Sequence, residues 1–250
     1  LAWLQEIPHE SVGLTGEGGC ALYGVYLDNR SDKTAVLVHG YAGDWTTRAH
    51  NARLYRSLGF NVLLVDNPGH GKSGGAYITM GYQDAPALLY WTDWLVRTKN
   101  TAAVVLDGVS MGAAAVLSVA NYGTRPAIKG IVSDCSFTSA YDELRSQCKR
   151  RHIPCALLLR SMCRLARKHG FDLREKSPIE GVRRSTVPTL FIHGDKDRFV
   201  PFGMVRALYD ANASEKRLLV TEGVPHAASY LLAEEKYTAA VADFVTQVTA

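Results

Sequence analysis

The chain has 250 residues, of which 47% are hydrophobic and 21% are charged, so it can bury a sizeable core as a single domain over residues 1–250. Its net charge of +4, from 28 basic and 24 acidic residues, is too small to indicate nucleic-acid binding. The five cysteines are odd in number and form no CxxC pair, which argues against a disulfide framework or a zinc site.

Short, continuously apolar segments recur along the chain and predict strands that are buried on both faces of a parallel sheet. In chain order they are 12–15 with its partner 20–27, a run ending near His39, 61–66, 102–108, 130–135, 189–195 and 217–223. Helical spacing lies between them, at 46–57, 82–99, 111–122, 202–211 and 230–248. This alternation predicts an α/β fold with a mostly parallel, doubly wound sheet of about eight strands.

One connection is too long for a simple crossover between strands. About fifty residues separate Cys135 from Val187, far more than connections in compact domains usually contain. Residues 141–170 within it have helical character, with leucines and Met162 available for an apolar face. We therefore expect a helical cap, inserted over about 137–186 into the single domain.

The strongest chemical signal is Gly108-Val109-Ser110-Met111-Gly112, a G-x-S-x-G sequence between a predicted strand and an alanine-rich predicted helix. A turn this tight needs flanking positions nearly free of side-chain atoms, and it lifts the serine above the edge of the sheet. The helix N-terminus and the N–H of Met111 are then placed to stabilise an oxyanion. Ser110 is thus the predicted nucleophile, and a serine in an ordinary glycine-rich turn is the alternative.

A serine hydroxyl needs a base, and for a serine on such a turn the expected chain order is serine, acid, histidine. Of the eight histidines only His226 follows the last predicted strand, so it is the predicted base. The acid should follow the preceding strand, where Asp195 and Asp197 are both candidates. Asp195 suits a turn-capping role, whereas Asp197 lies farther toward the crevice above the strand ends and is favoured.

The second oxyanion donor is expected in the loop 39–43, whose small residues let the backbone approach a substrate. The N–H of Tyr41 is the predicted donor, paired with that of Met111. His39, at the start of this loop, is expected to form structural hydrogen bonds rather than to act as a second base.

Taken in order, the segments LVHGYAG, DNPGHGKS, GVSMG, HGDKDRFVP and VPH resemble the α/β-hydrolase superfamily. Within it the chain is similar to small bacterial serine hydrolases of the YqkD type, near the cinnamoyl esterases and serine aminopeptidase-like proteins. The resemblance spans residues 22–244 and implies a catalytic serine, paired oxyanion amides and a cap over the pocket. It also aligns Asp197 with the catalytic acid. The chain departs from the pattern at Pro68, where relatives usually have arginine, and at Ala113, where many have a third glycine.

The predicted function is hydrolysis of a small-molecule carboxylic ester through an acyl-enzyme, with no metal or organic cofactor. A peptidase, a thioesterase or an acyltransferase would use the same residues, and a catalytically silent binding module is the alternative from another class. Dehalogenases and epoxide hydrolases are disfavoured, because related enzymes of those types have aspartate in place of Ser110.

Two other patterns are weaker. Residues 69–74 match G-x-G-x-x-G, but the match is isolated and does not predict a nucleotide site. Residues 141–185 contain twelve lysines and arginines against five acidic residues. This excess predicts either a solvated helical face or attraction to acidic substrates or to an anionic membrane surface.

The sequence defines neither the oligomeric state nor the location of the protein. No run reaches the roughly 18 consecutive apolar residues of a membrane span. The chain starts at Leu1 rather than Met, so we allow for membrane association through a missing N-terminal anchor. With the resemblance above, this suggests a cytoplasmic or membrane-tethered bacterial domain.

Overall fold

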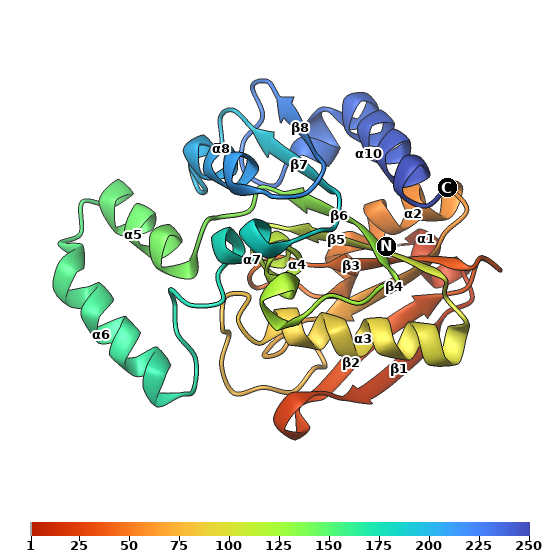
Figure 1. The fold of residues 1–250 in the computed structure, drawn as a ribbon, viewed down its shortest axis with the longest axis horizontal. Helices are drawn as coiled ribbons and strands as arrows, with labels where there is room; N and C mark the ends of the chain where they lie inside the picture. Colours follow the sequence, from red (N-terminus) through yellow and green to blue (C-terminus); the bar gives the residue numbers. More distant parts are fainter. Residues whose placement is uncertain (1) are drawn as a thin grey trace.

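A computed structural model describes residues 2–250 and is built on one eight-stranded sheet (Figure 1). The strand order is β1-β2-β4-β3-β5-β6-β7-β8. The strands are β1 (Glu10–Thr15), β2 (Ala21–Leu27), β3 (Lys33–Val38), β4 (Asn61–Asp66), β5 (Ala103–Val109), β6 (Ile128–Asp134), β7 (Thr189–Gly194) and β8 (Lys216–Thr221). Strand β2 is antiparallel to β1 and β4, whereas β3 to β8 pair in parallel. The predicted mostly parallel α/β sheet is therefore confirmed.

Helices cover both faces of this sheet, because alternate strand residues point to opposite sides. Val36 and Val38 belong to one core cluster, and Ala35 and Leu37 belong to the other. The first cluster is covered by α3 (Asp84–Lys99), α4 (Met111–Ser118), α7 (Pro178–Arg184) and α8 (Phe202–Ala211). The second is covered by α1 (Ala2–Glu6), α2 (Ala49–Ser57) and α10 (Glu234–Val248). The inner strands β3 to β7 are thus buried on both faces, as their continuous apolar runs predict, whereas the edge strands β1 and β8 are partly exposed.

Several predicted helices differ in their limits. The segment 46–57 begins as a 3-10 helix, Trp45–Arg48, before α2, and 111–122 ends as another, Val119–Tyr122. The segment 230–248 is divided between the short α9 (Ser229–Leu232) and α10. These differences leave the order of the elements unchanged.

The long connection between β6 and β7 contains three helices. Two of them, α5 (Ala140–Arg150) and α6 (Cys155–Lys168), stand apart from the sheet at the left of Figure 1. They are separate helices because Pro154 precedes α6 and has no backbone N–H to continue α5. The third, α7, packs against α4 although it falls inside the predicted limits of the cap. Of these three helices, α5 and α6 therefore lie outside the helical layers of the sheet.

Two general features bear on location and redox state. Among residues 2–250, none of the helices combines the length and apolar character needed to cross a bilayer. All five cysteines are free thiols in this part of the chain.

Candidate active site

Ser110 occupies the turn that joins β5 to α4, with its backbone in the left-handed region at φ 55°. Glycine flanks it for steric reasons. A Cβ on Gly112 would lie 2.5 Å from the carbonyl oxygens of Val38 and His39, and one on Gly108 would collide with the backbone of Gly112. The G-x-S-x-G spacing is therefore what allows the turn to close against β3. A strained residue held by its surroundings is common at functional sites.

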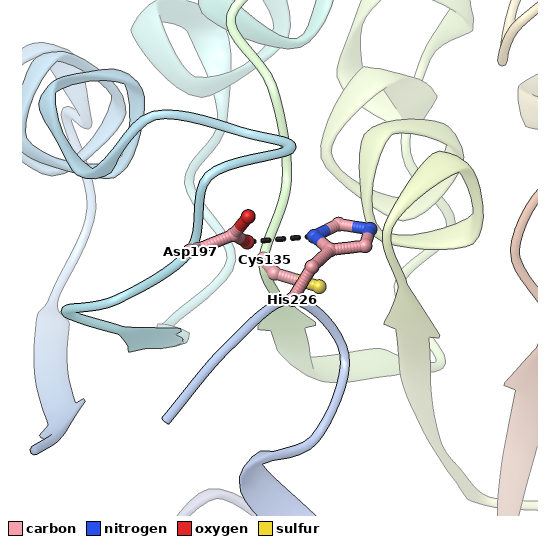
Figure 2. Close-up of side chains that lie close together, drawn as sticks. All are labelled: Cys135, Asp197 and His226. Carbon is pink, nitrogen blue, oxygen red and sulfur yellow. Dashed lines mark hydrogen bonds and ion pairs between the residues drawn. The ribbon is translucent and has the colours of Figure 1, made fainter. Parts of the chain in front are cut away.

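His226 connects Ser110 to Asp197. Its Nε2 lies 2.9 Å from the Ser110 hydroxyl oxygen, and its Nδ1 lies 2.6 Å from Oδ2 of Asp197. Figure 2 shows the imidazole facing the Asp197 carboxylate across this short contact. The structure thus brings together three residues that are 116 and 29 positions apart along the chain.

The Asp197 carboxylate is held in place from its other side. Its Oδ1 accepts hydrogen bonds from the N–H groups of Phe199 and Val200, both at 2.8 Å. The loop therefore fixes one carboxylate oxygen, while Oδ2 contacts His226 and lies 3.4 Å from Nε2 of the buried His193. Asp195, the other candidate acid, accepts the Gly223 N–H at 2.7 Å and is engaged in the loop rather than at His226.

Cys135 is a neighbour that the sequence analysis did not single out. Its thiol lies with the Asp197 and His226 ligand atoms within 4.8 Å of one another, beneath the pair in Figure 2. Burial raises the pKa of this thiol well above its usual range, whereas a metal-bound cysteine is a thiolate. Because the other two side chains already bond to each other, we do not read this group as a metal site.

Tyr41 and Met111, the residues of the two predicted oxyanion donors, border one cavity together with Ser110. Met111 is the first residue of α4, and the first N–H groups of a helix have no acceptor within the helix. Gly40, directly before Tyr41, approaches so closely that a Cβ there would lie 3.4 Å from the Cβ of Ser110. The Gly40 carbonyl accepts a hydrogen bond from His39 Nδ1 at 2.7 Å, and His39 Nε2 in turn accepts the Asn67 N–H at 3.0 Å.

Two cavities meet at Ser110, Tyr41 and Phe199. The larger, of about 620 Å³, is bounded by the helices α5 and α6 and has a mainly apolar wall. That wall includes Ile78, Met80, Met111, Phe137, Leu144, Met162, Leu165, Phe171 and Leu173. The smaller, of about 390 Å³, has a more polar wall that includes Thr47, Arg48, His50, Asn51, Asp134, His226 and Tyr230. The larger is called cavity A and the smaller cavity B below.

Buried charged side chains, Arg48 and Asp134, form part of the wall of cavity B. Arg48 forms an ion pair with Asp107, and both side chains are inaccessible to solvent or nearly so. Asp134 lies beside them, with one carboxylate oxygen buried and without a hydrogen-bond partner among the described residues. Burial raises the pKa of Asp134 from 3.8 to about 7, with the negative charge of Asp107 adding to the shift and Arg48 and His226 opposing it. Burial therefore disfavours the ionised form of the Asp134 carboxyl.

This raised pKa predicts a pH-dependent effect of Asp134→Asn. The unfolded chain loses the Asp134 proton near 3.8, whereas the folded chain holds it up to about 7. Stability from this group is thus present at low pH and lost as the pH rises through that window. Asparagine cannot ionise. As the pH rises through this range, the free energy of unfolding of the variant should therefore increase relative to that of the parent by up to roughly 4 kcal/mol. Urea unfolding midpoints at several pH values measure the gain, and a difference that does not change with pH would contradict it.

Cavity A also contains one acid. Glu143 of α5 is buried, accepts a hydrogen bond from the Gln147 amide at 2.5 Å, and has a second oxygen with no partner in the described part of the chain. Burial raises its pKa to about 6. Gln147 also donates to the Phe199 carbonyl at 2.8 Å, which ties α5 to the loop of Asp197.

Comparison with known proteins places this chain in a family. A family model described as serine aminopeptidase, S33, matches residues 29–169. YqkD of Bacillus subtilis, an uncharacterized protein, is 27% identical over 218 residues, covering 85% of this chain and 70% of that protein. Lysophosphatidylserine lipase ABHD12 of Danio rerio is 27% identical over 208 residues. That match covers 75% of this chain but 49% of the lipase, so the chain spans about half of its length.

Solved structures with the same fold include two esterases. The Pyrococcus furiosus esterase Pf2001 superimposes with a TM-score of 0.82 at 22% identity, covering 100% of this chain and 96% of that one. An esterase from Exiguobacterium antarcticum gives 0.71 at 18% identity, covering 95% and 100%. At these identities the likeness establishes the fold.

Proposed function

We propose that this chain, which belongs to the serine aminopeptidase S33 family of the α/β-hydrolase superfamily, is a serine hydrolase that cleaves carboxylic esters. The observation that carries the proposal is the continuous hydrogen-bonded line from Asp197 through His226 to Ser110. A hydrolase is what the family and fold establish, and the ester and the serine are the proposed part.

In the proposed reaction His226 Nε2 takes the proton of Ser110 as the hydroxyl oxygen attacks the ester carbonyl. The tetrahedral oxyanion accepts hydrogen bonds from the N–H groups of Tyr41 and Met111. The C–O bond breaks as His226 gives its proton to the leaving alcohol, which leaves an acyl group on Ser110. Water, deprotonated by His226, then attacks the acyl carbonyl and releases the acid and free Ser110. Asp197 stabilises the imidazolium of His226 during both acylation and deacylation.

The two cavities suggest how the ester lies. The oxygen of the leaving alcohol must come within hydrogen-bond reach of His226 Nε2 to receive its proton. His226 lines cavity B and not cavity A, so the alcohol belongs in cavity B and the acyl group in cavity A. The apolar wall of cavity A favours a hydrocarbon chain, and the polar wall of cavity B favours an alcohol that carries further polar groups. The name of the ABHD12 relatives, lysophosphatidylserine lipase, describes a substrate of this kind for those proteins.

A pair of reversed esters tests this orientation. Glycerol mono-octanoate presents an apolar acid and a polar alcohol, whereas octyl glycerate presents the same groups on the opposite sides of the ester. Glycerol mono-octanoate should have a kcat/KM at least about tenfold higher than octyl glycerate. In octyl glycerate the octyl group would lie in the polar cavity B and the hydroxyl groups in the apolar cavity A, and both placements are unfavourable. Equal rates would contradict the assignment of the cavities. A panel of p-nitrophenyl esters, run beside peptide and thioester substrates, tests ester preference itself.

Filling cavity A provides a second prediction. Met162→Trp places a larger side chain in its wall, so kcat/KM on p-nitrophenyl octanoate should fall by about tenfold or more while the acetate ester is affected little. Ala156→Trp is the matched control, because Ala156 is exposed on α6 and does not line the cavity. An equal loss on both esters would mean that Met162 does not border the acyl group.

An aminopeptidase is the second candidate, and Glu143 is the observation that favours it. A carboxylate in the wall of cavity A, with an oxygen left unbonded in the described residues, suits the ammonium group of a peptide N-terminus. Amino-acid p-nitroanilides distinguish the two functions. If they are cleaved faster than esters, and if Glu143→Gln removes that advantage, the aminopeptidase proposal replaces the esterase one.

A further inference from the structure

The charge of this chain is concentrated in α5, α6 and the turn between them. Residues 145–168 contain eight lysines and arginines and no aspartate or glutamate. Because the whole chain carries +4, the rest of it carries −4. The molecule is therefore a dipole whose positive end is the pair of helices that projects from the body in Figure 1.

Helix α6 divides into an inner and an outer face. Leu159, Cys163 and Ala166 are buried, and Cys163 and Ala166 belong to the core cluster beside cavity A. On the outer side Leu157 is 77% exposed and Leu165 is 58% exposed.

Large apolar side chains on a surface helix normally face the core, so their presence on the outer face indicates a partner. The docking face is defined here by Ile153, Leu157, Leu158 and Leu165 with the surrounding Arg150, Arg151, Arg160 and Arg164, all of which are exposed.

We propose that the docking face binds an anionic lipid surface. Exposed leucines flanked by arginines are the pattern of a helix that lies in the plane of a membrane interface, with leucine in the acyl region and arginine at the headgroups. Charge complementarity favours anionic lipids over neutral ones, because residues 145–168 contain basic side chains and no acidic ones. A two-fold dimer through this face would oppose its own arginines, so a second copy of the chain is disfavoured.

The docking face is continuous with cavity A. Leu165 belongs to both, and Met162, one turn earlier on α6, lines the cavity wall. An acyl chain could therefore pass from the lipid layer into the cavity along one apolar edge without crossing water. This second consequence rests on the proposed esterase function, whereas the docking itself does not.

Vesicle sedimentation tests the docking. The protein used is Ser110→Ala, so that no lipid is consumed, and the vesicles are phosphatidylcholine alone or phosphatidylcholine mixed with phosphatidylglycerol. Binding is expected to the mixed vesicles only, and it should weaken as salt is added. Replacing Arg160 and Arg164 by glutamine should weaken the partition coefficient by roughly thirty-fold, at about 1 kcal/mol per charge. Leu157→Gln with Leu158→Gln should weaken it at least about tenfold.

Matched controls lie elsewhere on the surface. Leu232→Gln removes a leucine that is 65% exposed near α9, and Arg97→Gln removes an exposed arginine of α3. Neither should change vesicle binding. Equal loss in the controls, or no binding to either vesicle, overturns the proposal. So does self-association, if gel filtration of the parent shows a dimer that Leu157→Gln dissociates.

The same surface substitutions, made in protein that keeps Ser110, separate this proposal from the proposed function. Leu157, Leu158, Arg160 and Arg164 do not line either cavity, so hydrolysis of a water-soluble ester should be unchanged in all of them. Docking without ester hydrolysis would leave the lipid proposal standing and reject the esterase. Ester hydrolysis without docking would leave the esterase proposal standing and reject the lipid proposal.

Discussion

Ser110→Ala is expected to reduce ester hydrolysis by on the order of 10⁵-fold or more, the scale seen when a triad serine is removed from a serine protease. The loss follows because the hydroxyl 2.9 Å from His226 Nε2 is the atom that forms the acyl bond. A fluorophosphonate probe should label the parent on Ser110 and leave the variant unlabelled. Kinetics on a p-nitrophenyl ester, with the intact mass of the labelled protein, measure both effects.

Ser110→Gly separates chemistry from folding. The left-handed backbone of Ser110 strains any side chain, and glycine adopts it without cost, so this variant should be more stable than Ser110→Ala by about 1 kcal/mol. Both variants should be equally inactive. If either retains activity near that of the parent while remaining folded, Ser110 is not the nucleophile.

The order of the elements and the nucleophile turn could be predicted because both depend on local sequence. Buried strands require continuous apolar runs, and the turn at Ser110 cannot form unless Gly108 and Gly112 lack side chains. The helix α7 was missed although its signal is present in the sequence. Ser177 and Glu180 have the spacing of a capping box, and the Ser177 N–H donates to the Glu180 carboxylate at 3.3 Å.

Features that depend on contacts between distant segments could not be predicted. Asp134 ends the apolar strand β6 and Cys135 follows it, with no local signal that marks either residue. Only the pairing of β6 with its neighbours brings Cys135 close to His226 and Asp134 into the wall of cavity B. The ion pair of Arg48 with Asp107 joins residues 59 positions apart. The sequence also leaves open whether the basic excess faces solvent or substrate, because this depends on how α6 turns. In the structure the arginines face outward, away from cavity A.

The choice between the two aspartates shows the same limit within a single loop. Asp195 and Asp197 both follow β7, and their spacing permits either to reach His226. Two backbone contacts separate them: Asp195 accepts the Gly223 N–H, whereas one oxygen of Asp197 is fixed by its own loop and the other faces the imidazole. We therefore propose Asp197 as the catalytic acid.

Asp197→Asn should lower kcat by roughly 10⁴-fold, the effect of the same change in a serine protease. The amide oxygen can still accept the N–H groups of Phe199 and Val200, so the loop should keep its shape. The amide nitrogen, however, would face Nδ1 of His226 as a donor. The imidazole would then carry its proton on Nε2, from which it cannot accept the Ser110 proton. Kinetics with a thermal unfolding curve measure the variant.

Asp195→Ala is the control for that variant. It removes the contact to the Gly223 N–H and a long, partly exposed ion pair with Lys196, so it should cost about 1 kcal/mol of stability and change kcat little. The pH dependence provides an independent check, because hydroxide in solution can take the Ser110 proton that the wrongly protonated imidazole cannot accept. Asp197→Asn should therefore recover part of its rate as hydroxide rises, whereas Asp195→Ala should follow the parent. If the loss in kcat follows Asp195 and spares Asp197, the contact at 2.6 Å is structural and the acid of this site lies elsewhere.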